Sequence, residues 1–266
     1  MIQAVLKAID VMGVFSSDEP TLSLGEISKR LNMPKSTTHN LLNTLASRKF
    51  IEKVNDESYA LGTAIISLSQ AARVNAEFRD RAAPLLRELA DVVKESVYLT
   101  YLDGDYLLYI YAIETPDRLM ARSAIGDRVP PHCTGVGKAL LAALPDAKVE
   151  EIVKRTGMPR FTENTVTDLE DLKRIITQTR ARGYSLDNQE HENGLYCVGA
   201  AIRDAHGTPI GACSISGLDP EIIASRATDL SAHLLYAAQE VSRHLGYIPS
   251  MPSLLVRRSN NANLSD

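Results

Sequence analysis

The chain has 266 residues, enough for one large domain or two ordinary ones, and its 44% hydrophobic content predicts a soluble protein with a buried core. The formal net charge of −4 excludes a protein that coats nucleic acid by bulk charge, but it allows a local basic patch. No stretch approaches the ~18 uncharged apolar residues of a membrane span. The N-terminus lacks a secretory signal pattern, and the three cysteines form no disulfide framework. We therefore expect a cytoplasmic protein without a membrane partner.

Residues 1–62 predict three short helices followed by a β-hairpin, the order of a winged helix-turn-helix. The third helix is expected to run from Pro34 to about Arg48, since proline suits the first turn of a helix. The remaining signals are an amphipathic stretch at 5–14, a Ser23-x-x-Glu26 capping box, and apolar segments at 50–54 and 59–61 around a polar turn.

The third helix has one apolar face and one face of short hydrogen-bonding side chains. Between residues 29 and 53, six basic side chains stand against one acidic side chain, Glu52. Asn, Ser and Thr contact base edges and phosphates in the major groove, and Lys and Arg contact phosphates. A small helical bundle with a polar face is the alternative interpretation. The predicted DNA-contacting residues are Lys35, Ser36, Thr37, His39, Asn40, Asn43 and Arg48.

The rest of the chain predicts a linker helix over 63–79 and an α/β domain with an antiparallel sheet over 80–249. Asp103-Gly104 lies between two strand-like segments and predicts a hairpin. Residues 250–266 are polar and are expected to be disordered. Further strands are expected at 119–124, 196–203 and 209–216, and helices at 135–144, after Pro145, from a Thr167-x-x-Glu170 capping box to Gly183, and at 220–245.

Gly135-Val136-Gly137-Lys138 resembles a nucleotide-binding loop but does not fit one. A Walker loop needs glycine where His132 stands, and a dinucleotide fingerprint needs glycine where Leu140 stands. The segment is better interpreted as a loop that enters a helix, whose free N–H groups can bind a carboxylate. Ser214 and Ser216 are two residues apart, so on a strand they point to the same face. Small residues in strands also commonly just pack, which is the alternative interpretation.

The sequence resembles the IclR family of bacterial transcriptional regulators over about residues 3–247. The motifs that carry the resemblance are AVLKAID (4–10), LNMPKSTTHNLL (31–42), YALG (59–62), HCTGVGKALL (132–141), GYSLD (183–187), CVGAAI (197–202) and SISG (214–217). The resemblance implies an α+β protein with an N-terminal winged helix-turn-helix, a linker helix and a C-terminal GAF-like effector-binding domain. One recognition helix reads only a few base pairs, and the helix over 63–79 has more apolar surface than a lone linker needs, so we expect a homodimer on a palindromic operator in double-stranded DNA. The resemblance extends this expectation to a dimer of dimers. Asn40 and Ala60 depart from the family, which usually has arginine at both positions.

The resemblance further implies a pocket for a small organic-acid effector, lined by Gly135, Val136, Asp187, Cys197, Ser214 and Ser216, with Asp187 in the loop before the Cys197 strand. Neither a cofactor nor a metal is expected, because the histidines and cysteines lack metal-site spacing. His132 and Cys133 supply residue types found in hydrolases, but they are adjacent in sequence and no nucleophile elbow is present. The competing hypothesis is a GAF-like binding protein or enzyme that uses its helix-turn-helix only for assembly.

Overall fold

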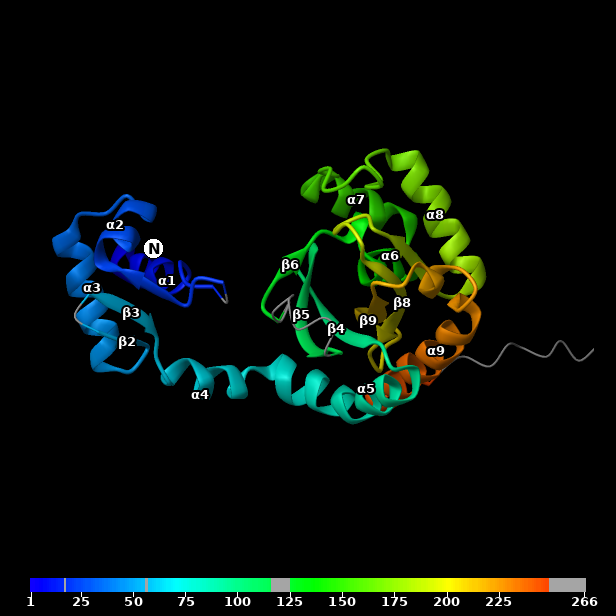
Figure 1. Cartoon of the computed structure of the whole chain (residues 1–266), viewed down its shortest axis with the longest axis horizontal. Helices are drawn as coiled ribbons and strands as arrows, with labels where there is room; N and C mark the ends of the chain where they lie inside the picture. The colour runs from blue at the N-terminus through cyan, green and yellow to red at the C-terminus, as the bar shows by residue number, and fades with distance from the viewer. Residues whose placement is uncertain (17, 56, 116–124, 249–266) are drawn as a thin grey trace, which may run out of the picture.

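The computed structural model describes residues 1–16, 18–55, 57–115 and 125–248. Figure 1 shows a small N-terminal body and a larger C-terminal body, with a helical connection between them. The predicted mixed α+β architecture is confirmed. The expected strand at 119–124 and the expected disordered tail at 250–266 lie outside the described residues. Among the described helices, none is long and apolar enough to cross a membrane.

The N-terminal body is the predicted winged helix-turn-helix. A strand that the sequence did not predict, β1, pairs with the hairpin in a sheet of order β1-β3-β2. The capping box is confirmed, because the Glu26 N–H donates to Ser23 Oγ at 3.2 Å and the Ser23 N–H donates to Glu26 Oε2 at 2.8 Å. The elements are α1 (Gln3–Met12), β1 (Thr21–Ser23), α2 (Leu24–Arg30), α3 (Lys35–Ser47), β2 (Ile51–Lys53) and β3 (Ser58–Leu61).

The connection between the bodies is not the single helix predicted over 63–79. It consists of α4 (Ala64–Ala71), a π-helical turn at Asn75–Arg79, and α5 (Asp80–Val93). Ala72 is extended, with ψ of 126°, and ends α4. No residue of α4 is buried, so the short helix lacks the tertiary packing that normally stabilises helices in proteins. Helix propensity alone is therefore not enough to continue α4 into α5 as one helix.

The C-terminal body is built on one antiparallel sheet of order β6-β5-β4-β9-β8-β7. Gly104 has φ of +66° in the β4–β5 turn, a conformation that glycine adopts without steric cost. Strand β7 was not predicted as a strand, and it places Asp187 in the sheet rather than in a loop. The strands are β4 (Ser96–Asp103), β5 (Tyr106–Ile113), β6 (Arg128–Val129), β7 (Ser185–Asn188), β8 (Tyr196–Arg203) and β9 (Pro209–Gly217).

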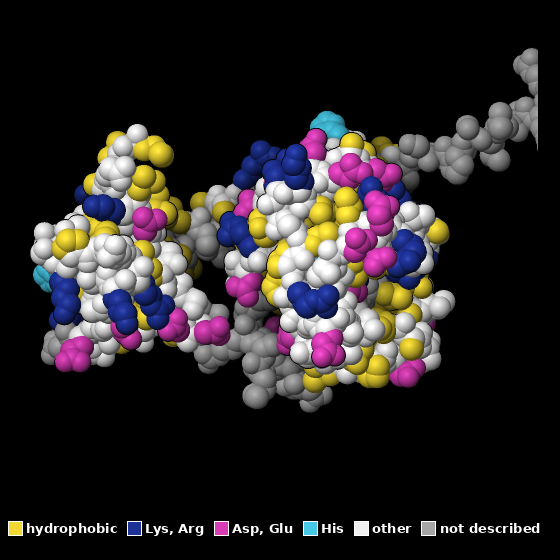
Figure 2. All heavy atoms as spheres, turned by 90° about the horizontal axis from the view of Figure 1, so that it is seen from above, with side chains coloured by type: hydrophobic (Ala, Val, Ile, Leu, Met, Phe, Trp, Pro, Cys, Tyr) yellow, Lys and Arg dark blue, Asp and Glu magenta, His cyan; other side chains and the backbone are white. Residues whose placement is uncertain are grey.

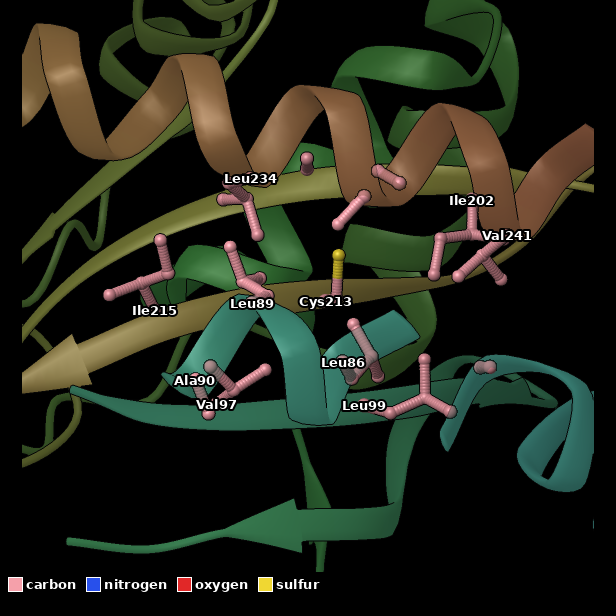
Figure 3. Packing of buried hydrophobic residues seen from close by; sticks show 14 of the residues in the cluster. Leu86, Leu89, Ala90, Val97, Leu99, Ile202, Cys213, Ile215, Leu234 and Val241 are labelled. Carbon is pink, nitrogen blue, oxygen red and sulfur yellow. The ribbon is translucent and has the colours of Figure 1, made fainter. Parts of the chain in front are cut away.

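Helices cover both faces of the sheet. Alternate residues of β8 and β9 pack against α5 and α9, and Figure 3 shows Cys213 in this core between Leu86 of α5 and Leu234 of α9. The other face packs against α6, which contacts β8 and β9 and is flanked by α7 and α8. The helices are α6 (Gly135–Ala143), α7 (Asp146–Thr156), α8 (Leu169–Arg182) and α9 (Ala227–His244).

Two predicted helix starts are wrong, one by a single residue and the other by about seven. The cap of α8 is Asp168 rather than Thr167, because the Asp168 carboxylate accepts from the N–H groups of Glu170 and Asp171. The last helix begins at Ala227 rather than near 220, because Asp219 caps a separate 3₁₀ turn at Pro220–Ile223. The predicted end of α8 at Gly183 is confirmed by a φ of +87° at that residue.

Candidate DNA-binding surface and effector pocket

Helix α3 presents its polar face to solvent. Thr38 and Leu42 are fully buried against the N-terminal core and fix the rotation of the helix. Of the seven residues predicted to contact DNA, Lys35, Ser36, His39, Asn40, Asn43 and Arg48 are exposed, whereas Thr37 is half-buried. The exposed side chains are free to reach a ligand as large as a DNA duplex.

The basic side chains near α3 are not equally available. Arg30 is already paired with Glu19 at 2.6 Å, whereas Lys35 and Arg48 are exposed near the two ends of α3. Figure 2 shows several Lys and Arg side chains of the N-terminal body on its visible surface. Gly62, which follows β3, lies directly against the backbone between α3 and β2, since a Cβ there would lie 2.2 Å from the Lys49 carbonyl oxygen.

The six residues predicted to bind an effector line a single pocket of about 350 Å³. The sheet brings three of them into one row, because Asp187 lies opposite Cys197 and Cys197 opposite Ser216. Ser214 and Ser216 point to the same face, as their spacing predicted, and their hydroxyl oxygens are 3.2 Å apart. All six residues are buried, so they form the floor of the pocket.

The start of α6 lies directly against β8. A Cβ on Gly199 would lie 2.4 Å from the Gly135 carbonyl oxygen, and a Cβ on Gly135 would lie 3.0 Å from Cys197 Cβ. Thr134 caps the helix by accepting from the Gly137 N–H at 3.1 Å. The absence of side chains at these two glycines is what allows the first turn of α6 to reach the pocket floor.

Asp187 is the ionisable group of this floor. Burial raises its pKa to about 6, against the opposing effects of the nearby Lys138 charge and of N–H groups of Glu190 and Gly135. The Glu190 N–H donates to Asp187 Oδ1 at 2.9 Å. The Asp187 carboxyl is therefore mostly ionised at pH 7 and becomes protonated as the pH falls below about 6.

Several pocket residues were not singled out from the sequence. Tyr98 and Tyr109, on β4 and β5, form an edge-to-face pair with ring centroids 5.7 Å apart. The predicted Asp103-Gly104 hairpin placed these two strands side by side, but it did not indicate that the two rings line the pocket. The other unpredicted lining residues are Asp18, Glu114, Asp127, Val129, Thr134, His191, Glu192 and Leu195.

A buried ion pair between Lys138 and Glu190 was also missed. Lys138 is on α6 and Glu190 follows β7, and their side chains are 1% and 9% exposed. The sequence placed Lys138 in a glycine-containing motif at the start of the helix predicted over 135–144. Nothing in the local pattern indicated that its ammonium group would be buried against a carboxylate 52 residues away.

Residues 70–243 match the bacterial transcriptional regulator IclR C-terminal family, and residues 4–55 match the IclR helix-turn-helix domain. The Escherichia coli transcriptional repressor IclR is 32% identical over 248 residues, which cover 92% of this chain and 90% of that protein. The chain belongs to the IclR family. The structure of Thermotoga maritima IclR is similar, with a TM-score of 0.78 and 30% identity, over 93% of this chain and 100% of that one.

A second structural neighbour was solved with a small molecule. It is an IclR homolog from Microbacterium hydrocarbonoxydans complexed with 4-hydroxybenzoate, with a TM-score of 0.80 over 91% of this chain and 98% of that one. At 23% identity this likeness concerns the fold alone. Three relatives at 32% identity carry the names of repressors and regulators rather than of enzymes, as expected for an IclR-family chain.

His132 and Cys133, the residue types found in hydrolases, are both fully buried in this structure. Burial raises the pKa of Cys133, so its thiol stays protonated, and a thiol is a poor nucleophile. His132 is fully buried, and its Nε2 lies 3.0 Å from the Pro159 carbonyl oxygen. Within the described ranges, no three His, Cys, Asp or Glu side chains are grouped so as to hold a metal ion.

A second pocket lies elsewhere in the C-terminal body. It has a volume of about 460 Å³ and lies between α6, α8 and α9. It contains none of the residues predicted to bind an effector. Arg180, on its wall, already contacts the Ala142 and Leu144 carbonyls and the Asp146 carboxylate. We therefore place the candidate effector site at the smaller pocket.

Proposed function

We propose that the protein is an operator-binding regulator of the cytoplasm whose DNA affinity changes when a small organic acid enters the C-terminal pocket. The observation that carries the proposal is the convergence of six residues from four elements, α6, β7, β8 and β9, in one buried floor. In this proposal residues 1–62 bind DNA, residues 63–79 link the bodies, and residues 80–249 sense the effector. The family relationship supports the DNA-binding half of the proposal.

The floor suits one anionic group. It offers the Val136 N–H in the first turn of α6 and two hydroxyl groups, since the Gly135 and Gly137 N–H groups already contact Asp187 and Thr134. Its described lining residues include neither lysine nor arginine. Ser214 and Ser216 are bonded to each other, so one of their two hydroxyl hydrogens is left for a ligand. Because Asp187 would repel a second carboxylate, we favour a monocarboxylate or hydroxy acid, aromatic acids included, over a dicarboxylate.

The DNA half of the proposal assigns α3 to the major groove. Ser36, Thr37, His39, Asn40 and Asn43 would contact bases, while Lys35 and Arg48 would contact phosphates. Binding to duplexes selected from a random pool tests this assignment, with and without a panel of carboxylic acids. Loss of salt dependence, or failure to enrich any sequence, would contradict operator binding.

The proposed assembly is a homodimer, or a dimer of dimers. One α3 helix reads only a few base pairs, so specificity needs at least two copies. Exposed apolar side chains on α1 and α4 support the proposal, since Val5, Ile9, Ile66 and Leu68 are 52–63% exposed. We expect a palindromic operator with half-sites about one helical turn apart. Analytical ultracentrifugation at micromolar concentration tests this assembly. A monomer that binds a single half-site would contradict it.

The effector half is tested by Ser214→Ala combined with Ser216→Ala. We expect the double variant to bind operator DNA as the unaltered protein does and to lose its response to the effector, because an effector acts only through preferential binding to one state. Ser231→Ala is a matched control, since Ser231 is a buried serine of α9 outside the pocket. A full effector response in the double variant would refute this site.

A further inference from the structure

The effector pocket has a rim whose chemistry differs from that of its floor. The floor residues are buried, whereas the rim carries carboxylates that are exposed or half-buried. They come from loops at the ends of separate elements: after α1, after β5, before β6, and between β7 and β8. The rim carboxylates are Asp18, Glu114, Asp127 and Glu192.

These carboxylates lack cationic partners within the described part of the chain. The Glu114 carboxylate accepts a hydrogen bond from the Tyr98 hydroxyl at 3.2 Å, which is a neutral donor. None of the four rim carboxylates forms an ion pair with a described Lys, Arg or His. Burial lowers the pKa of His191, the histidine that lines this pocket, so its ring adds no positive charge near pH 7.

A ligand that carries only negative charge meets opposing demands in this pocket. Its carboxylate is attracted by the Val136 N–H and the hydroxyl hydrogen of the floor, but it must pass several rim carboxylates that form no ion pair with a described Lys or Arg. A cationic group at the other end of the same ligand removes the conflict, because it neutralises the rim while the carboxylate occupies the floor. Hydroxyl groups would satisfy the acceptors of the rim without neutralising their charge.

We propose that the effector is a zwitterion, with a carboxylate on the pocket floor and an ammonium group at the rim among Glu114, Asp127 and Glu192. The proposal rests on the proposed function, since it takes the organic-acid site as its starting point. Asp18 extends it, because this rim residue belongs to the α1–β1 loop of the N-terminal body. An ammonium group at the rim would therefore act on both bodies of the protein.

Calorimetry on the full chain with matched ligand pairs tests the proposal. The probes are 3-aminopropanoate, 4-aminobutanoate, 5-aminopentanoate and 4-(aminomethyl)benzoate, each paired with the acid in which a methyl group replaces the ammonium group. We expect at least one zwitterion to bind about tenfold or more tighter than its partner acid. Glu114→Gln combined with Asp127→Asn should abolish that preference and leave binding of the partner acid intact.

Glu170→Gln combined with Asp229→Asn is the matched control, since it removes two exposed carboxylates of α8 and α9 that lie outside the pocket. This control should keep the preference. Equal or tighter binding of the methyl acids overturns the zwitterion and leaves the organic-acid site standing. If simple amines bind and carboxylates do not, both proposals fail. Absence of binding by every zwitterion at millimolar concentration overturns the zwitterion proposal.

Discussion

The Lys138 ammonium group and the Glu190 carboxylate form a buried ion pair, and the backbone of Glu190 is hydrogen-bonded to the floor of the effector pocket. The Glu190 N–H donates to Asp187, which lines the pocket. Glu190 Oε2 has no hydrogen-bond partner among the described residues, so the pair depends on its single ionic contact. The Lys138 ammonium group therefore contacts Glu190, and Glu190 in turn is hydrogen-bonded to Asp187.

Lys138→Met should destabilise the protein strongly. Removal of one partner leaves the Glu190 charge buried and unpaired, which typically costs about 3–5 kcal/mol. Replacement of both residues, Lys138→Met with Glu190→Leu, should restore most of that loss, because neither charge then remains buried. Denaturant titration of both variants measures the difference. A cost below about 1 kcal/mol for the single change would show that the pair is not desolvated as the structure indicates.

Asn40→Ala and Asn43→Ala should each change operator preference at one base pair by about 1–3 kcal/mol, because a bidentate amide contact to a base edge is lost. Both side chains are exposed on α3, so little change in folding stability is expected. Titration against single-base operator variants checks this prediction. An unchanged base preference in both variants would show that this face of α3 does not read sequence.

Lys35→Ala should weaken binding to all DNA sequences by a similar factor. A phosphate contact carries no sequence information, and its loss should reduce the slope of log K against log salt by about one. Lys148→Ala, on α7 of the C-terminal body, is a suitable control because it removes an exposed lysine far from α3 in sequence. A sequence-dependent loss would assign Lys35 to a base instead.

Asp187 should make stability depend on pH. Because burial raises its folded-state pKa from 3.8 to about 6, Asp187 lowers the stability of the protein at pH 7 by about 3 kcal/mol. This loss is absent below the unfolded pKa and grows as the pH rises through the folded pKa. Asp187→Asn should therefore stabilise the protein more at pH 7.5 than at pH 5. Unfolding free energies measured at both pH values test the sign, and a gain that is independent of pH would contradict it.

Gly199→Ala should disturb the pocket without touching any charged group. Its Cβ would lie 2.4 Å from the Gly135 carbonyl oxygen and 2.6 Å from Ser185 Oγ, so the start of α6 must move. We expect a stability loss of about 1–3 kcal/mol, as for other overpacked sites, together with weaker effector binding. Gly25→Ala on α2 is a control, because a Cβ there meets only Ser23 Oγ at 3.9 Å and the residue lies outside the pocket. Unchanged effector binding in Gly199→Ala would show that the first turn of α6 is not part of the site.

Local periodicity and short motifs were enough to predict several features of this protein. The spacing of Thr38, Leu41 and Leu42 fixes which face of α3 is buried, and the alternation at Ser214 and Ser216 places both hydroxyls on one face of β9. The helix-turn-helix, the hairpins and the family relationship follow from signals of this kind.

Tertiary structure alone decided which distant groups meet. Lys138 and Glu190 pair, and Asp187 lies beside Cys197, because the sheet order brings β7 and β8 together under α6. The end of α4 at Ala72 could not be predicted from the sequence either. No residue of α4 is buried, so helix propensity was the only local signal and tertiary packing did not extend the helix. Pairings between distant segments depend on burial and strand order, and local sequence patterns encode neither.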